Sequence, residues 1–238
     1  MQAQQLLTNL ENEALIGLKL NSKKTKVMIF NQPAYELETI SHEKLESVEN
    51  FKYLGSWMES SEKDFEVRKA LAWSNCHKLR KIWSSNISSA IKKKLFISTV
   101  ESTLLYGSET WTVSKTLEKK LNECYTCMLR MCLNVSWQQK LTNDQLYGDL
   151  PPVSHKVAIR RMRLAGHCAR HPELVASSLI LWEPKFGNAK RGRPAVNYLN
   201  TLKNDTGLET ANELLNAMQD RTSWKEYSRL VRAGARPK

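Results

Sequence analysis

The sequence has no segment of the kind that carries a protein into or across a membrane. Its apolar runs all fall short of the roughly 18 consecutive residues that a membrane-spanning helix needs. The opening segment, MQAQQLLTNLENEAL, has no basic stretch leading into an apolar core, which a secretory signal requires. We therefore expect an intracellular protein that makes no contact with a membrane.

Motifs for nucleophilic or hydrolytic catalysis are absent as well. The sequence contains no Gly-x-Ser-x-Gly, no phosphate-binding P-loop and no His-Glu-x-x-His. Its aspartates occur singly and never as an Asp-Asp pair, so the paired carboxylates that hold two catalytic metal ions are missing. The sequence thus indicates no catalytic residues and no cofactor in this chain.

Cysteines are few and odd in number. They are Cys76, Cys124, Cys127, Cys132 and Cys168. In a chain without an export signal they are most simply interpreted as reduced thiols. The pair Cys124-x2-Cys127 and the histidines His167 and His171 have the look of zinc ligands. Cys124 and Cys132, however, fall on or beside the apolar stripe of a helix, which favours core thiols over a metal site.

Positive charge is abundant but confined to one part of the chain. Residues 1–60 carry 6 Lys and 8 acidic residues, a net charge of −2. Residues 61–238 carry 30 Lys and Arg against 16 acidic residues, a net charge of +14. General solubility is one explanation, but this excess is more than solubility demands of a domain this size. The distribution favours a polyanionic partner, RNA and/or DNA.

Hydrophobic periodicity predicts an α+β, predominantly α fold in three regions. Residues 1–60 begin with a helix over the first sixteen residues, followed by a strand at 26–30 and further strands within 35–58, with turns at 31–33 and 41–43. Residues 61–150 read as an antiparallel bundle of three helices. Pro151-Pro152 marks a break before the basic helical region over 151–238, whose tail consists of short helices.

Each helix of the bundle has an expected core face. The first, within 62–83, carries Phe65, Ala72, Cys76, Leu79 and Trp83, with basic residues including Arg68 on its remaining surface. The second begins at Ser88 or Ser89, ends near Gly107 and carries Ile91, Leu95, Val100 and Leu105. The third follows Ser114 with Leu117, Leu121, Cys124 and Met128.

The helix after Ser154 carries a basic face. At about 100° per residue, one narrow stripe contains Lys156, Arg160, Arg163, His167 and Arg170. The opposite stripe contains Ala158, Met162, Ala165 and Ala169. A solvated helix face would normally interleave acidic residues, and this stripe has none. We expect these basic side chains to contact phosphates, with a strong dependence on salt.

A second basic motif, Lys-Arg-Gly-Arg-Pro, spans residues 190–194. Extended Arg-Gly-Arg can lie in a narrow A·T minor groove, where Arg191 and Arg193 would meet enhanced negative potential. The motif can equally be a turn that joins two helices, with the proline ending one of them. The sequence leaves both interpretations open.

Two motifs in the first region resemble the end of the palm of LINE-type (non-LTR) retrotransposon reverse transcriptases. These are LNSKKTKVMIF, with Lys24 and Lys26, and FKYLGS, with Tyr53, Leu54 and Gly55. The resemblance implies that the lysines lie near nucleotide phosphates and that Tyr-Leu-Gly forms the turn that grips the primer. From the residues alone, a solvated basic turn and an ordinary strand-ending turn are the alternatives.

The resemblance extends over most of the chain, from about residue 10 to 230. Four further segments occur in the same order as in the thumb and C-terminal region of that family. They are LLYGSETW, MLRMCLNVSW, RRMRLAGHCAR and RGRP. The resemblance implies that the chain is a fragment that lacks the aspartate-bearing palm and is inactive alone. Only the intact parent enzyme would need magnesium, and no small-molecule substrate is expected for the fragment. We expect a retroelement fragment that binds nucleic acid. Of the two intracellular locations, the nucleus is favoured over the cytoplasm. The alternative is a non-catalytic binding or protein-interaction module derived from such an element.

Overall fold

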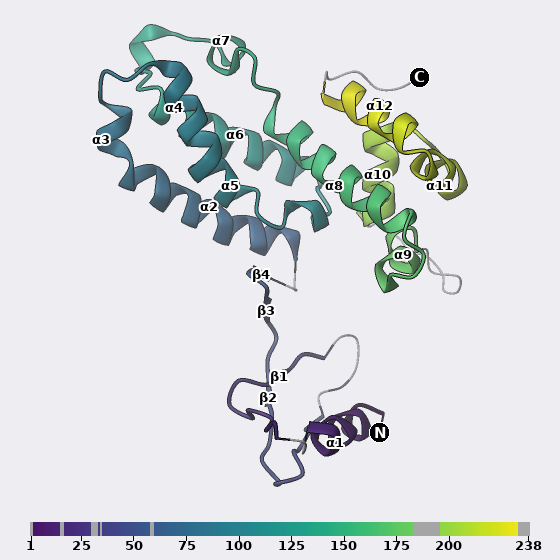
Figure 1. Ribbon diagram of the computed structural model, residues 1–238. Helices are drawn as coiled ribbons and strands as arrows, with labels where there is room; N and C mark the ends of the chain where they lie inside the picture. The colour runs from purple at the N-terminus through teal and green to yellow at the C-terminus, as the bar shows by residue number, and fades with distance from the viewer. Residues whose placement is uncertain are drawn as a thin grey trace. The chain divides into compact units, whose positions relative to one another are not determined.

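The computed structural model describes residues 2–14, 17–29, 33, 35–57, 60–182 and 196–232 (Figure 1). The chain forms two compact units, Met1–Ser60 and Ser61–Lys238. Helices dominate the described residues, whose strands form two small two-stranded sheets. The predicted α+β, predominantly α fold class is confirmed. None of the helices in these ranges is both long and apolar enough to cross a membrane.

The first unit is organised around a small core. Its helix α1 (Gln2–Ala14) confirms the helix predicted at the start of the chain and buries Leu7 against Leu37 and Leu45. The side chain of Gln4 fixes this helix to the following loop. Its Nε2 donates to the carbonyl of Glu38 at 2.6 Å, and its Oε1 accepts from the backbone N–H of Glu38 at 3.1 Å.

The strands of the first unit are shorter than predicted. β1 (Lys26–Val27) pairs in parallel with β2 (Glu46–Ser47), and β3 (Lys52–Tyr53) pairs antiparallel with β4 (Ser56–Trp57). Each of these strands has a single paired neighbour, so little backbone is held in a ladder. The turn predicted at 41–43 is confirmed by a bond from the N–H of Thr39 to the carbonyl of Glu43 (3.0 Å). Asn31 and Gln32, in the other predicted turn, lie outside the described residues.

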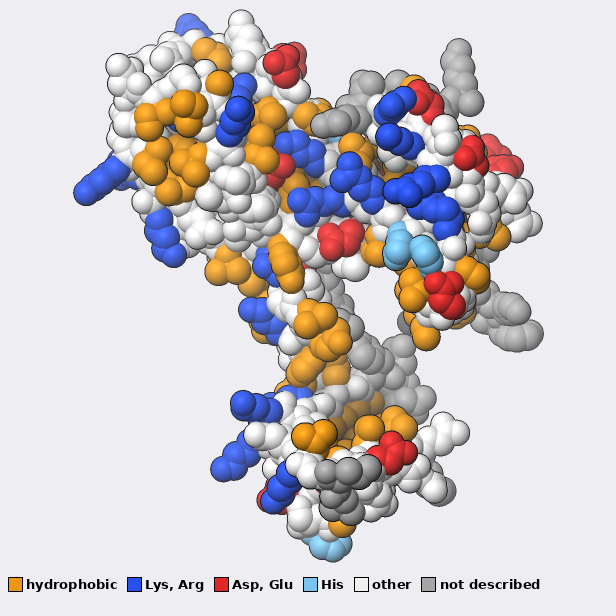
Figure 2. All heavy atoms as spheres, viewed as in Figure 1, with side chains coloured by type: hydrophobic (Ala, Val, Ile, Leu, Met, Phe, Trp, Pro, Cys, Tyr) orange, Lys and Arg blue, Asp and Glu red, His pale blue; other side chains and the backbone are white. Residues whose placement is uncertain are grey.

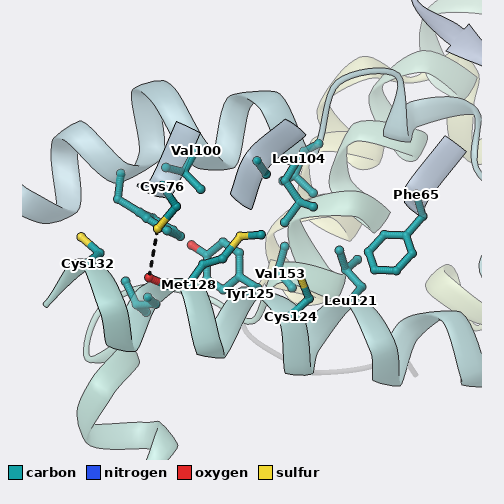
Figure 3. Close-up of a cluster of buried hydrophobic side chains, with 14 of the residues drawn as sticks. Phe65, Cys76, Val100, Leu104, Leu121, Cys124, Tyr125, Met128, Cys132 and Val153 are labelled. Carbon is teal, nitrogen blue, oxygen red and sulfur yellow. Dashed lines mark hydrogen bonds between the residues drawn. The ribbon is translucent and has the colours of Figure 1, made fainter. Parts of the chain in front are cut away.

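The second unit begins with the predicted helical bundle. Its helices are α2 (Ser61–Lys78), α3 (Arg80–Trp83), α4 (Ser89–Phe96), α5 (Ser102–Leu104), α6 (Lys115–Cys132) and α7 (Asn143–Tyr147). Ser114 begins α6 as predicted, because its hydroxyl accepts from the N–H of Leu117 at 3.2 Å and satisfies one of the free amides at the helix start. Buried side chains of α2, α5 and α6 interlock in the core (Figure 3).

One predicted core face is wrong in part. A π-helical turn, Ile97–Glu101, interrupts the helix that was expected to run unbroken from 88 to 107. A π turn accommodates an extra residue and so rotates the face that follows it relative to the face that precedes it. Val100 and Leu105 are fully buried as predicted, whereas Ile91, which lies before the turn, is 57% exposed.

Arg68 also departs from its predicted place on the polar side of its helix. It is buried, with its guanidinium 4.2 Å from the ring centroid of Tyr106 and its Nε 3.8 Å from Oδ1 of Asp64. The aromatic face and the carboxylate compensate part of the cost of removing this charge from water. Spacing along α2 reveals Asp64, four residues before Arg68, but not Tyr106, which comes from a distant segment.

The basic C-terminal region packs around helix α8 (Val153–Ala169). The helix starts two residues before the predicted His155, since Pro152 is tolerated at a helix start, where no N–H is needed. The remaining helices are α9 (Val175–Ile180), α10 (Tyr198–Thr206), α11 (Ala211–Gln219) and α12 (Arg221–Arg232). Val153 and Val157 of α8 join the bundle core, while Met162 and Ala165 join a second core with α10, α11 and α12.

Candidate nucleic-acid interface

Helix α8 has the two faces that its sequence predicts. Ala158, Met162, Ala165 and Ala169 are all buried in the second core. On the opposite side, Arg163 and His167 are exposed, and Lys156, Arg160 and Arg170 are half-buried. The basic face is therefore not uniform, and its members have different surroundings.

Lys156 is held by a buried carboxylate of the bundle. Its Nζ lies 2.5 Å from Oε2 of Glu101 and donates to the hydroxyl of Tyr125 at 3.1 Å. The Tyr125 hydroxyl donates to the same Oε2 at 2.6 Å. Burial, followed by the negative charge of Glu101, raises the pKa of Tyr125 far above its usual range, so this phenol remains a donor. Lys156 thus links α8 to the bundle.

Arg160 and Arg170 also contact the backbone of other elements. Nη1 of Arg160 donates to the carbonyl of Leu105 at 2.6 Å, and Nη1 of Arg170 donates to the carbonyl of Met218 at 2.7 Å. A guanidinium has five N–H donors, so each arginine keeps donors for a further acceptor. These two side chains therefore combine a structural contact with a charge at the surface.

Sequence reasoning missed the partner of this face, which is helix α12. Arg221, Lys225 and Arg229 follow one another at intervals of four residues and so share one side of the helix. That spacing was the available signal. Trp224, between them, donates its indole N–H to the carbonyl of Met162 at 2.7 Å and so attaches α12 to α8.

Helices α8 and α12 together form a basic groove with a volume of about 790 Å³. The Lys and Arg residues lining the basic groove are Lys156, Arg160, Arg163, Arg170, Arg221, Lys225 and Arg229. The acidic residues lining it are Glu101 and Asp149. Figure 2 shows Lys and Arg side chains clustered over this part of the second unit. Within the described residues, neither Arg163 nor Arg221 nor Lys225 forms an ion pair, so these three cations are available to a bound anion.

Arg161, next to Arg160 in the sequence, points into the protein instead. It is 2% exposed and its Nη1 lies 2.8 Å from Oδ2 of Asp205 on α10. Burial raises the pKa of Asp205 to about 6, and the attraction of Arg161 offsets only part of that effect. Burial also raises the pKa of Tyr198, whose hydroxyl donates to the carbonyl of Arg161 at 3.3 Å. Arg161 is thus a core residue.

The other predicted site residues belong to the first unit. Lys24 lies in a turn in which its backbone N–H donates to Oδ1 of Asn21 at 3.1 Å. Lys26 opens β1, and its ammonium group pairs with the carboxylate of Glu46 on the facing strand. The lysines are therefore neighbours in one turn and strand, and Lys26 has its charge partly compensated.

Tyr53, Leu54 and Gly55 form a tight hairpin. Tyr53 ends β3, and Leu54 and Gly55 make a two-residue connection with φ angles of 47° and 90°. Positive φ at both central positions is the pattern of a type I′ turn, which suits glycine at the second position. Tyr53 and Leu54 are 58% and 76% exposed. The second basic motif, with Arg191 and Arg193, lies outside the described residues.

The cysteines are largely core residues, as interpreted from the sequence. Cys76, Cys124, Cys132 and Cys168 are buried and Cys127 is exposed. Burial raises the pKa of Cys124 to about 11 and that of Cys132 to about 12, which keeps both thiols protonated. In the described part of the chain, no three His, Cys, Asp or Glu side chains are grouped so that they could hold a metal ion.

Comparison with known proteins gives a distant relative of transposon origin. The chain is 24% identical over 210 residues to an uncharacterized transposon-derived protein of Caenorhabditis elegans, with 80% of this chain and 73% of the relative covered. No family model matches the chain and no solved structure matches it. The similarity covers most of the chain and supports descent from a transposable element.

Proposed function

We propose that this chain is a nucleic-acid-binding protein of retroelement origin whose basic groove contacts the phosphodiester backbone. The observation that carries the proposal is the groove itself, in which seven Lys and Arg side chains from α8 and α12 face two carboxylates. Arginine forks match phosphate oxygens in geometry as well as charge. The similarity to a transposon-derived protein adds support, since mobile elements are copied and inserted as nucleic acid.

The finer form of the proposal concerns the parent enzyme. We propose a LINE-type reverse transcriptase as the ancestor, with residues 61–150 as its thumb and 151–238 as its C-terminal region. The order of motifs along the chain supports this ancestry. In that setting the hairpin at Tyr53, Leu54 and Gly55 would face a primer, and Lys24 and Lys26 would lie near phosphates. Arg191 and Arg193 would add a minor-groove contact.

Salt dependence measures how many cations meet phosphates. Each phosphate neutralised on duplex DNA contributes about −0.9 to the slope of log affinity against log salt. Arg163, Arg221 and Lys225 are the appropriate residues to change, because they have no ion pair with another described residue. Replacing all three with Gln should flatten the slope by about 3 on duplex DNA and by about 2 on a single strand. Arg160 and Arg170 are less suitable, because their loss would also remove hydrogen bonds to the backbone carbonyls of Leu105 and Met218 that hold α8 against other elements.

The experiment is fluorescence anisotropy across a salt series with single-stranded, duplex and RNA–DNA hybrid probes of equal length. A matched control replaces Lys78, Lys81 and Lys94 with Gln, which removes the same charge from exposed positions that do not line the groove. The control should leave the slope almost unchanged. Absence of binding to every probe at low salt, or equal slopes for the two triple variants, would overturn the proposal.

A further inference from the structure

We infer that the groove holds one nucleic-acid strand rather than a duplex, with its phosphates between α8 and α12 and an unpaired base against an aliphatic floor. This inference rests on the proposed function and adds the form of nucleic acid that the groove selects. It is carried by two properties of the groove, which are the closeness of its walls and the chemistry of its floor, and the orientation of its lining tryptophan bears on sequence tolerance.

The two basic walls of the groove are held close together. Gly166 of α8 and Trp224 of α12 are in such tight contact that a Cβ built on Gly166 would lie 2.5 Å from the indole ring. Helices that pack directly have axes about 8–10 Å apart. The major groove of B-DNA alone is about 12 Å wide, so a duplex would meet only the rim of this groove. One strand can lie between Arg163 on one wall and Lys225 on the other.

The floor of the groove is apolar at the end nearest the bundle. Ile97 of the π-helical turn, Leu150 and Pro151 before α8, and Ile159 of α8 line it and are half-buried. Cations complement phosphates, but aliphatic side chains form neither an ion pair nor a hydrogen bond with a phosphate. The apolar face of a base fits this floor. In a duplex that face is covered by stacking, so only an unpaired base is free to occupy the floor.

The aromatic ring of the groove does not serve as a stacking platform. Trp224 lines the groove, yet it is 4% exposed and its indole N–H is already bonded to the carbonyl of Met162. Aromatic stacking is the usual source of affinity in proteins that bind single strands. Here the base would rest on aliphatic groups, which have no donors or acceptors to read its edge. Binding should therefore be tolerant of sequence.

The test compares probes of one length whose bases are unpaired, paired or absent. Anisotropy at one fixed low salt concentration is measured for a single strand, the matching duplex and an abasic strand of the same length. We expect the single strand to bind about tenfold more tightly than the duplex and the abasic strand, because one unpaired base buries apolar surface against the aliphatic floor. Parallel RNA and DNA strands show whether the ribose hydroxyl contributes.

A variant of the floor tests the contribution of the apolar floor to single-strand binding separately from that of the basic walls. Ile159→Ser should weaken binding of the single strand about fivefold and leave the duplex unaffected, whereas Ile91→Ser, at an exposed site on α4, should change neither. Circular dichroism of each variant confirms that it folds. Duplex binding equal to or tighter than that of the single strand, or equal affinity for the abasic strand, would overturn this inference while leaving nucleic-acid binding intact. Failure of every probe to bind would overturn both proposals.

Discussion

Gly166 and Trp224 meet in a contact that fixes α12 against α8. A Cβ on Gly166 would lie 2.5 Å from Cδ1 and Nε1 of the Trp224 indole, closer than nonbonded atoms approach. The indole has little room to move aside, because its N–H is bonded to the carbonyl of Met162 at 2.7 Å and the ring is buried. A glycine in the middle of a helix is usually unfavourable, so its presence here reflects the need for close packing.

Replacing Gly166 with Ala should therefore destabilise the protein. An alanine in a helix interior normally stabilises by about 0.5–1 kcal/mol relative to glycine. Overpacking against Trp224 should outweigh that gain and lower the free energy of unfolding by about 1–3 kcal/mol. Urea denaturation followed by circular dichroism gives the sign directly. A more stable Gly166→Ala protein would show that the helices do not approach as described.

The Lys156–Glu101 pair gives a second prediction. Both groups are largely buried, with side-chain exposures of 15% and 9%. Glu101→Gln or Lys156→Met alone leaves one charge without its partner and should cost about 3–5 kcal/mol of unfolding free energy. The double variant should lose less than the sum of the two, since no isolated charge remains. Strictly additive losses in urea denaturation would contradict a direct pair.

Much of the helical fold is predictable because its determinants are local. Ser114 caps α6 through an amide three residues away, and Gly207 ends α10 with a φ of 77° that glycine adopts readily. The apolar faces of α2 and α6 follow from their own spacing. The π-helical turn at Ile97–Glu101 could not be predicted in this way, because the helix on either side has ordinary composition.

The candidate site was predictable only in part, and for the same reason. The basic face of α8 can be predicted because its residues belong to one segment. The residues that engage some of its side chains in structural contacts come from distant segments. Lys156 meets Glu101, and Arg160 meets the carbonyl of Leu105, each across 55 residues of sequence. The second wall of the basic groove, helix α12, is held in place by the contact of Trp224 with α8. Hydrophobic periodicity does not predict this contact. The sequence of α8 therefore predicts which residues are charged. It does not tell the cations that make structural contacts from those that are available to a bound anion.

Asp205 predicts a pH dependence of stability. Burial raises its pKa from 3.8 to about 6, with Arg161 offsetting part of the shift. The folded protein therefore holds this proton more tightly than the unfolded chain, so the group's contribution to stability is fully present below about pH 4 and is lost as the pH rises through about 6. Relative to Asp205→Asn, the natural protein should lose about 3 kcal/mol of unfolding free energy between about pH 4 and about pH 8.

This prediction is checked by urea denaturation of both proteins at several pH values. The comparison with Asp205→Asn cancels the contributions of other titrating groups that the two proteins share. A difference in stability that stays constant with pH, or that changes in the opposite direction, would contradict the raised pKa of Asp205.

Thiol reactivity should separate Cys127 from the other cysteines. Cys127 is exposed, whereas the other four thiols are buried, and burial raises the pKa of Cys124 to about 11. Because the thiolate is the reactive species, iodoacetamide at about pH 8 should modify Cys127 first in the folded protein and all five cysteines in urea. Fragmentation of tryptic peptides in tandem mass spectrometry locates each adduct, which is needed because Cys124 and Cys127 lie in the same peptide. Cys127→Ser should remove the rapid phase, and rapid modification of Cys124 in the folded protein would show that its thiol is not enclosed by α2 and α6.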